Sequence, residues 1–98
     1  MDFRDLRTQD ARLVILRSLN EDAGYELNES VLQSFLEALG HKLSRDRVLT
    51  ELAWLEEQGL VRLREVVGVK IAGLTSRGSD VATGASTVPG VKRPRARD

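Results

Sequence analysis

The side chains best suited to chemistry in this chain are basic and hydroxyl groups between residues 42 and 50. An arginine can donate two hydrogen bonds to the acceptors of a guanine edge, and a helix amino terminus can hold a phosphate. These groups favour contact with DNA, with Arg47 as the candidate for a base and Arg45 for a phosphate. The predicted set is Lys42, Ser44, Arg45, Arg47 and Thr50.

The same stretch carries more acid than base. The helix expected from Ser44 to Gly59 holds two arginines against Asp46, Glu51, Glu56 and Glu57, which is a net charge of −2. A carboxylate more commonly opposes phosphate than binds near it. A solvated face of salt-bridged charges therefore explains these residues as well as DNA contact does, and both interpretations stay open.

Two more groups of basic residues extend the candidate DNA surface. Two alternating runs predict a hairpin whose exposed face carries Arg62, Arg64 and Lys70 and whose buried face carries Val61, Leu63, Val69 and Ile71. The chain ends in Lys92, Arg93, Arg95 and Arg97. This end is interpreted either as an arm that follows phosphates or as a solubilising terminus that touches nothing.

Trp54, the only tryptophan, falls on the polar face of the expected helix. Tryptophan is enriched among binding hot spots, so Trp54 is the candidate protein-interface residue. The alternative is that the hairpin, the first helix or the tail covers its ring.

Few side chains of this sequence could support metal binding or catalysis. The chain has no cysteine and one histidine, His41, so a soft-metal site cannot be assembled from its side chains. His41 is expected to be a solvated turn residue or a phosphate neighbour. No nucleophile motif and no glycine-rich phosphate loop is present, so we expect no catalysis and no cofactor.

Composition indicates one globular domain with a local charge asymmetry. The 98 residues are 41% hydrophobic, and 15 basic residues balance 15 acidic ones. Residues 91–98 carry a net charge of +3, so residues 1–90 carry −3 and attract DNA only through a local patch. No segment has the pattern of a membrane span or signal peptide, which predicts a cytoplasmic protein.

The first helix is expected from Thr8 or Gln9 to about Asn20, with a possible backward extension through Phe3 and Leu6. Its apolar residues 13–16 lie on all sides of a helix. It is therefore either covered by its own chain or shared with a second copy, which makes a homodimer through this helix possible.

Capping residues place the other elements. A short strand at residues 25–27 precedes a second helix, which Asn28 or Ser30 caps and Gly40 ends. Ser44 caps the third helix, and Gly59 ends it. Thr75 then caps a last helix that reaches about Ala82.

This order predicts an α+β winged helix-turn-helix with a three-helix core, a short β-hairpin wing and a short C-terminal helix. Residues 1–83 form the expected domain. Residues 84–98, where both prolines lie, are expected to form a flexible basic tail.

Three segments resemble the landmarks of MarR- and ArsR-like winged-helix regulators: residues 12–19 (RLVILRSL), 52–61 (LAWLEEQGLV) and 74–78 (LTSRG). Residues 80–84 (DVATG) and 88–94 (VPGVKRP) add a resemblance to the small winged-helix proteins of Mu-like transposable phages. The resemblance implies a phage or prophage origin. It does not imply a metal sensor, because the cysteine and clustered histidine ligands of such sensors are missing.

The sequence therefore predicts a noncatalytic DNA-binding protein, a transcriptional regulator encoded by a phage or prophage, with double-stranded DNA as its partner. The alternative is a winged helix used as a protein-interaction or assembly module, which would dock through the Trp54 face or the first helix.

Overall fold

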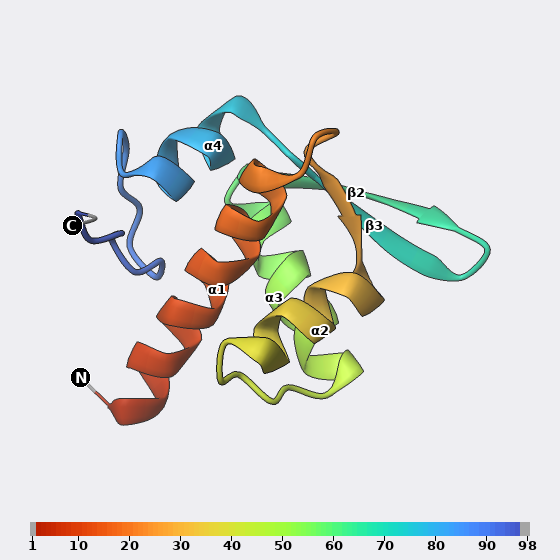
Figure 1. The fold of residues 1–98 in the computed structure, drawn as a ribbon, viewed down its shortest axis with the longest axis horizontal. Helices are drawn as coiled ribbons and strands as arrows, with labels where there is room; N and C mark the ends of the chain where they lie inside the picture. The colour runs from red at the N-terminus through yellow and green to blue at the C-terminus, as the bar shows by residue number, and fades with distance from the viewer. Residues whose placement is uncertain (1, 97–98) are drawn as a thin grey trace.

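The computed structural model describes residues 2–96 as four helices and a small antiparallel sheet (Figure 1). This is an α+β chain whose arrangement is compatible with the expected winged helix. Along the chain the elements are α1 (Phe3–Glu21), β1 (Glu26–Asn28), α2 (Glu29–Ala38), α3 (Arg45–Glu57), β2 (Val61–Val66), β3 (Val69–Leu74) and α4 (Ser76–Thr83).

Helix α1 begins earlier than the capping prediction from Thr8. Its cap is Asp2, whose side chain accepts a hydrogen bond from the Arg4 amide at 2.9 Å, so Thr8 lies inside the helix. The apolar residues Ala11, Leu13, Ile15, Leu16 and Leu19 are all buried along α1. The rest of this chain therefore supplies much of the cover that its all-round apolar sequence requires.

Helices α2 and α3 begin and end where the sequence indicated. Asn28 caps α2 by accepting from the Val31 amide, and Ser44 caps α3 by accepting from the Arg47 amide. Gly40 has a φ of +91°, which a residue without Cβ adopts readily, and it turns the chain out of α2. A short turn thus joins two helices that pack on each other through Leu32, Leu36, Val48, Leu52 and Leu55.

The sheet has the order β1-β3-β2, and Figure 1 shows the β2–β3 hairpin projecting from the helical body. Val66 pairs with Val69 across a turn of Val67 and Gly68, whose φ values are both positive, as in a type I′ turn. Leu63 faces Ala72, and Arg64 faces Ile71.

This register corrects the predicted faces of the hairpin. Residues directly opposite share a face, so Leu63 shares the helix-facing side with Ala72 and Lys70, whereas Ile71 and Val69 lie on the other side with Arg62 and Arg64. A two-residue turn pairs odd positions of β2 with even positions of β3. The sequence prediction placed the odd-numbered residues of both strands on the same face of the hairpin. It was therefore wrong for Val69, Ile71 and Lys70.

The segment after α4 packs against the domain, which differs from the flexible tail expected at residues 84–98. Val88 and Val91 are buried, and the Lys92 amide donates to the Gln9 carbonyl of α1 at 3.1 Å. Figure 1 shows this segment returning beside α1. No helix within residues 2–96 is long and apolar enough to cross a bilayer.

Candidate nucleic-acid interface

The start of α3 is tied to both α2 and the β2–β3 hairpin by Arg45. Its Nε donates to Glu29 Oε2 at 2.8 Å, and its Nη2 donates to Glu29 Oε1 at 3.2 Å and to the Gly68 carbonyl at 3.4 Å. Glu29 also accepts from the Lys70 amide at 2.8 Å. One carboxylate from the first turn of α2 therefore fixes the guanidinium and the hairpin together.

Glu29 is held as an anion although only 3% of its surface is exposed. The hydrogen bond from Arg45 is the main cause that lowers the Glu29 pKa, and the Lys70 amide adds to it, while burial opposes both. The same carboxylate raises the pKa of Arg45. The Arg45 side chain remains 61% exposed, so its positive charge faces solvent.

Arg47 is fixed by a second buried carboxylate, Glu51, one turn further along α3. Arg47 Nε donates to Glu51 Oε2 at 2.8 Å, and Arg47 Nη2 donates to the Thr8 hydroxyl at 2.7 Å. Glu51 also accepts from Arg12 Nε of α1 at 2.7 Å. Two guanidinium groups therefore surround one carboxylate, and the group of three carries a net positive charge.

The burial of Glu51 changes the charge that α3 presents. Glu51 is 3% exposed, whereas Glu56 is exposed and uses one carboxylate oxygen, Oε2, to accept from the Leu63 amide at 2.8 Å. One of the four acids that opposed DNA contact in the sequence, Glu51, is thus buried and paired inside the molecule. Asp46, Glu56 and Glu57 remain exposed on α3.

The other predicted residues of this helix and its turn lie on the surface. Lys42 is exposed in the turn before α3, where the structure gives it no ion-pair partner within residues 2–96. Thr50 is exposed and donates its hydroxyl hydrogen to the Asp46 carbonyl at 3.0 Å. The Ser44 hydroxyl oxygen caps α3 by accepting from the Arg47 amide at 3.1 Å.

The hairpin does not gather its three basic residues on one face. Lys70 lies on the helix-facing side and pairs with Glu65 at 3.3 Å. Arg62 and Arg64 lie on the opposite side, where Arg64 pairs with Glu26 at 3.3 Å. Lys70 therefore belongs with the start of α3, and the two arginines form a separate patch.

Trp54 is half-buried beneath parts of its own chain. The Arg12 guanidinium lies 3.7 Å from the centre of the indole ring, a cation–π contact. Arg12 Nη1 also donates to the Gly90 carbonyl at 3.0 Å, and Gly90 sits directly on the ring. The first helix and the tail cover Trp54, one of the two alternatives that the sequence left open.

His41 is not the solvated turn residue that the sequence suggested. It is 6% exposed, and its Nε2 lies 2.6 Å from Asp10 Oδ2 of α1. Asp10 Oδ1 in turn pairs with Lys92 Nζ at 3.1 Å. Burial tends to raise the Asp10 pKa, but the hydrogen bonds from His41 and Lys92 outweigh it, and the pKa is lowered.

The basic residues of the C-terminal segment divide between packing and solvent. Lys92 is used against Asp10, as above, while Arg93 and Arg95 are exposed. Arg97 lies outside the described residues. Within residues 2–96 the structure contains no group of three histidine or acidic residues arranged to hold a metal ion.

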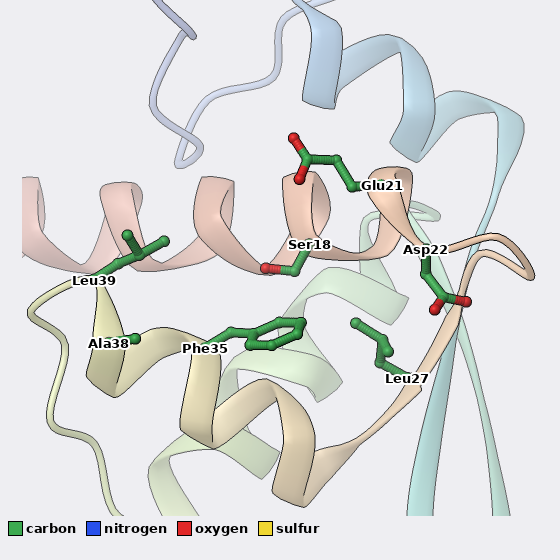
Figure 2. Close-up of a pocket in the computed structure, with 7 residues that line it drawn as sticks. All are labelled: Ser18, Glu21, Asp22, Leu27, Phe35, Ala38 and Leu39. Atoms are coloured by element: carbon green, nitrogen blue, oxygen red, sulfur yellow. The ribbon is translucent and has the colours of Figure 1, made fainter.

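A second surface feature, a groove between α1 and α2, was not anticipated (Figure 2). Its volume is about 430 Å³, and Phe35 and Ala38 of α2, with Leu39 directly after the helix, face Ser18 of α1 across it. Leu27 of β1, Glu21 and Asp22 also line the groove, and Figure 2 shows the Glu21 carboxylate pointing away from Phe35. Phe35 and Leu39 follow the helical spacing of the buried residues Leu32 and Leu36, yet they are 42% and 64% exposed.

Comparison with known proteins identifies relatives but no described activity. The chain is 54% identical over 95 residues to an uncharacterized protein, gp26, of Escherichia phage Mu, covering 97% of this chain and 98% of the relative. It is 50% identical over 78 residues to an uncharacterized protein of Haemophilus influenzae, covering 79% of this chain and 76% of the relative. No family model matches the chain. The chain belongs to the same family as gp26 of phage Mu.

Proposed function

We propose that the chain is a noncatalytic winged-helix DNA-binding protein of phage or prophage origin, which acts as a transcriptional regulator on double-stranded DNA. The observation that best supports this proposal is the Arg45–Glu29 pair, which joins the start of α3 to the hairpin. Arg45 donates to the Gly68 carbonyl, and Glu29 accepts from the Lys70 amide. A helix start and a wing held in one fixed relation suit the docking of a winged helix-turn-helix on a duplex.

The electrostatics of this surface support the proposal. Arg45, Arg47 and Lys70 have side chains that are 61%, 44% and 42% exposed, whereas the carboxylates that hold the two arginines are buried. The charge offered to a phosphate is therefore that of the guanidinium groups. The free amides in the first turn of α3 add a partial positive charge on the same side.

The corrected hairpin register narrows the proposed contact set. It comprises the start of α3 with the turn before it, together with the helix-facing side of the wing: Lys42, Ser44, Arg45, Arg47, Thr50 and Lys70. Arg62 and Arg64 point from the opposite face of the sheet and are left out of it. The exposed Arg93 and Arg95 would add affinity without sequence selectivity.

The protein-interaction alternative loses one of its two docking surfaces. Arg12 and Gly90 cover the ring of Trp54, so a partner would have to displace them first. The first helix and its groove with α2 remain as a docking surface for that alternative.

Lys42→Ala and Lys70→Ala test the DNA proposal without disturbing the buried carboxylates, because the Lys70–Glu29 bond uses the Lys70 backbone amide. We expect each variant to weaken binding to a labelled duplex of the phage's own DNA by roughly two- to fivefold. Arg62→Ala is the matched control and should bind like the unaltered protein. Equal losses in all three variants, or in none, would contradict the proposed surface.

A further inference from the structure

Arg12 of α1 joins the C-terminal segment to α3. Its Nε donates to Glu51 Oε1 at 2.7 Å, and its Nη1 donates to the Gly90 carbonyl at 3.0 Å. The guanidinium also lies 3.7 Å from the centre of the Trp54 ring. These contacts hold the Arg12 side chain where it is only 15% exposed, so Arg12 is poorly placed to bind a ligand itself.

Glu51 divides its two oxygens between Arg12 and Arg47. Oε1 accepts from Arg12, as above, and Oε2 accepts from Arg47 Nε at 2.8 Å. The Glu51 side chain is 4% exposed, whereas the Arg47 side chain is 44% exposed. Of these three charged groups, Arg47 is therefore the one that a ligand reaches most easily.

The charges of the three side chains determine how strongly Arg47 attracts an anion. Two guanidinium groups and one carboxylate give a net charge of +1. Without Arg12 the net charge would be zero, and Glu51 Oε1 would be open to a second hydrogen bond from Arg47. A guanidinium and a carboxylate bind most strongly through two parallel bonds. The carboxylate would then largely cancel the positive charge that Arg47 offers to a phosphate.

We propose that Arg12 is a positioning residue for DNA binding, which compensates the charge of Glu51 and so leaves the Arg47 guanidinium available to a phosphate. This inference rests on the proposed function, because it concerns the same surface. Arg12 itself stays at Glu51, held by the Gly90 carbonyl and the Trp54 ring. The C-terminal segment therefore contributes to DNA binding through Arg12.

Duplex binding by Arg12→Gln tests the proposal, because glutamine removes the charge and keeps a hydrogen-bond donor. We expect this variant to bind a labelled duplex of the phage's own DNA about three- to tenfold more weakly than the unaltered chain. Adding Glu51→Gln should restore the affinity to within about twofold, because the net charge of the three side chains is again that of the unaltered protein. A loss caused only by disturbed packing would not be restored by a second change in the interior.

Arg17→Gln is the matched control, since it removes the same charge from the same helix. Arg17 lies about 140° around α1 from Arg12, where it lines a hollow beside α4. The Arg17 variant should bind like the unaltered chain, and thermal unfolding checks that each variant is folded. Glu51→Gln alone makes the group more positive and should bind at least as tightly as the unaltered chain, which keeps the test decisive if Arg12→Gln does not fold.

Three results would overturn the proposal: Arg12→Gln binding like the unaltered chain, a loss that Glu51→Gln does not restore, or an equal loss in Arg17→Gln. Weaker binding by a folded Glu51→Gln variant would overturn it as well. Failure of the proposed function is distinguishable, because the unaltered chain would then bind no duplex and the inference would fall with it. Duplex binding that Lys42→Ala weakens and Arg12→Gln leaves unchanged would refute the inference alone.

Discussion

At the scale of single residues, the buried carboxylates Glu29 and Glu51 organise the basic surface. Each is 3% exposed, and each is bound by at least one guanidinium. A buried anion without partners is costly, so arginine placement and helix packing depend on each other. This is why Arg45 is a poor target for an alanine test of DNA contact: its removal would leave Glu29 unpaired.

Glu29→Gln is expected to lower the free energy of unfolding at pH 7 by about 1–3 kcal/mol, because charge-assisted hydrogen bonds to Arg45 and the Lys70 amide become neutral ones. The folded-state pKa of Glu29 is lowered, so its stabilisation is present above the unfolded pKa of about 4.3 and is lost as pH falls through the folded value. The variant should therefore show a weaker loss of stability below about pH 4.

Chemical unfolding at a series of pH values measures this effect. Glu57→Gln, at an exposed carboxylate on α3, is the matched control and should follow the unaltered protein. An acid dependence that is identical in Glu29→Gln and the unaltered protein would refute the stabilising role of the pair.

At the scale of elements, the helix boundaries could be predicted except for the cap of α1, and the long-range pairings could not. Caps and stops act within a few residues, so Asn28, Ser44 and Thr75 mark helix starts from sequence alone. The pairing of Arg45 with Glu29, and the face on which Lys70 lies, depend on how distant segments meet. The hairpin faces were predicted wrongly because the two-residue turn places odd-numbered residues of β2 opposite even-numbered residues of β3. Alternation within one strand does not reveal which residues of the other strand lie opposite.

The packing of the C-terminal segment was missed for a similar reason. Proline, glycine and small residues indicate a chain without regular elements, and residues 84–96 form none. Val88 and Val91 are buried in this segment, and Gly90 contacts Arg12 of α1 and Trp54 of α3, which are far away in the sequence. The composition of this segment predicts its irregular local conformation, but it does not predict that the segment packs against the rest of the domain.

Gly90→Ala tests whether this segment is held on Trp54. Gly90 has a φ of +96°, and an added Cβ would lie 2.8 Å from two carbons of the indole ring. We expect a loss of about 2–4 kcal/mol of unfolding free energy from backbone strain and overpacking together. The fluorescence of Trp54 should also shift to longer wavelength as its cover loosens.

Gly40→Ala provides the control, because its φ is +91° but nothing lies within 4 Å of an added Cβ. It should cost only the backbone strain, about 1–2 kcal/mol, with no change in Trp54 emission. Equal losses for the two variants and an unchanged spectrum would show that Gly90 does not press on the ring.

At the scale of the whole molecule, basic and apolar surfaces lie on different parts of the fold. The start of α3 and the helix-facing side of the hairpin carry the exposed cations, and the α1–α2 groove with the first turns of α1 carries exposed apolar side chains. A neutral chain can still bind DNA when its cations gather in such a patch.

The most direct test of the central claim is the salt dependence of duplex binding. If Lys42, Arg45, Arg47 and Lys70 each neutralise one phosphate, the logarithm of the association constant should fall with the logarithm of salt concentration at a slope of about −4. Changing both Lys42 and Lys70 to alanine should reduce the slope to about −2. A flat response in the unaltered protein, or a slope that the double variant leaves unchanged, would contradict DNA recognition by this surface.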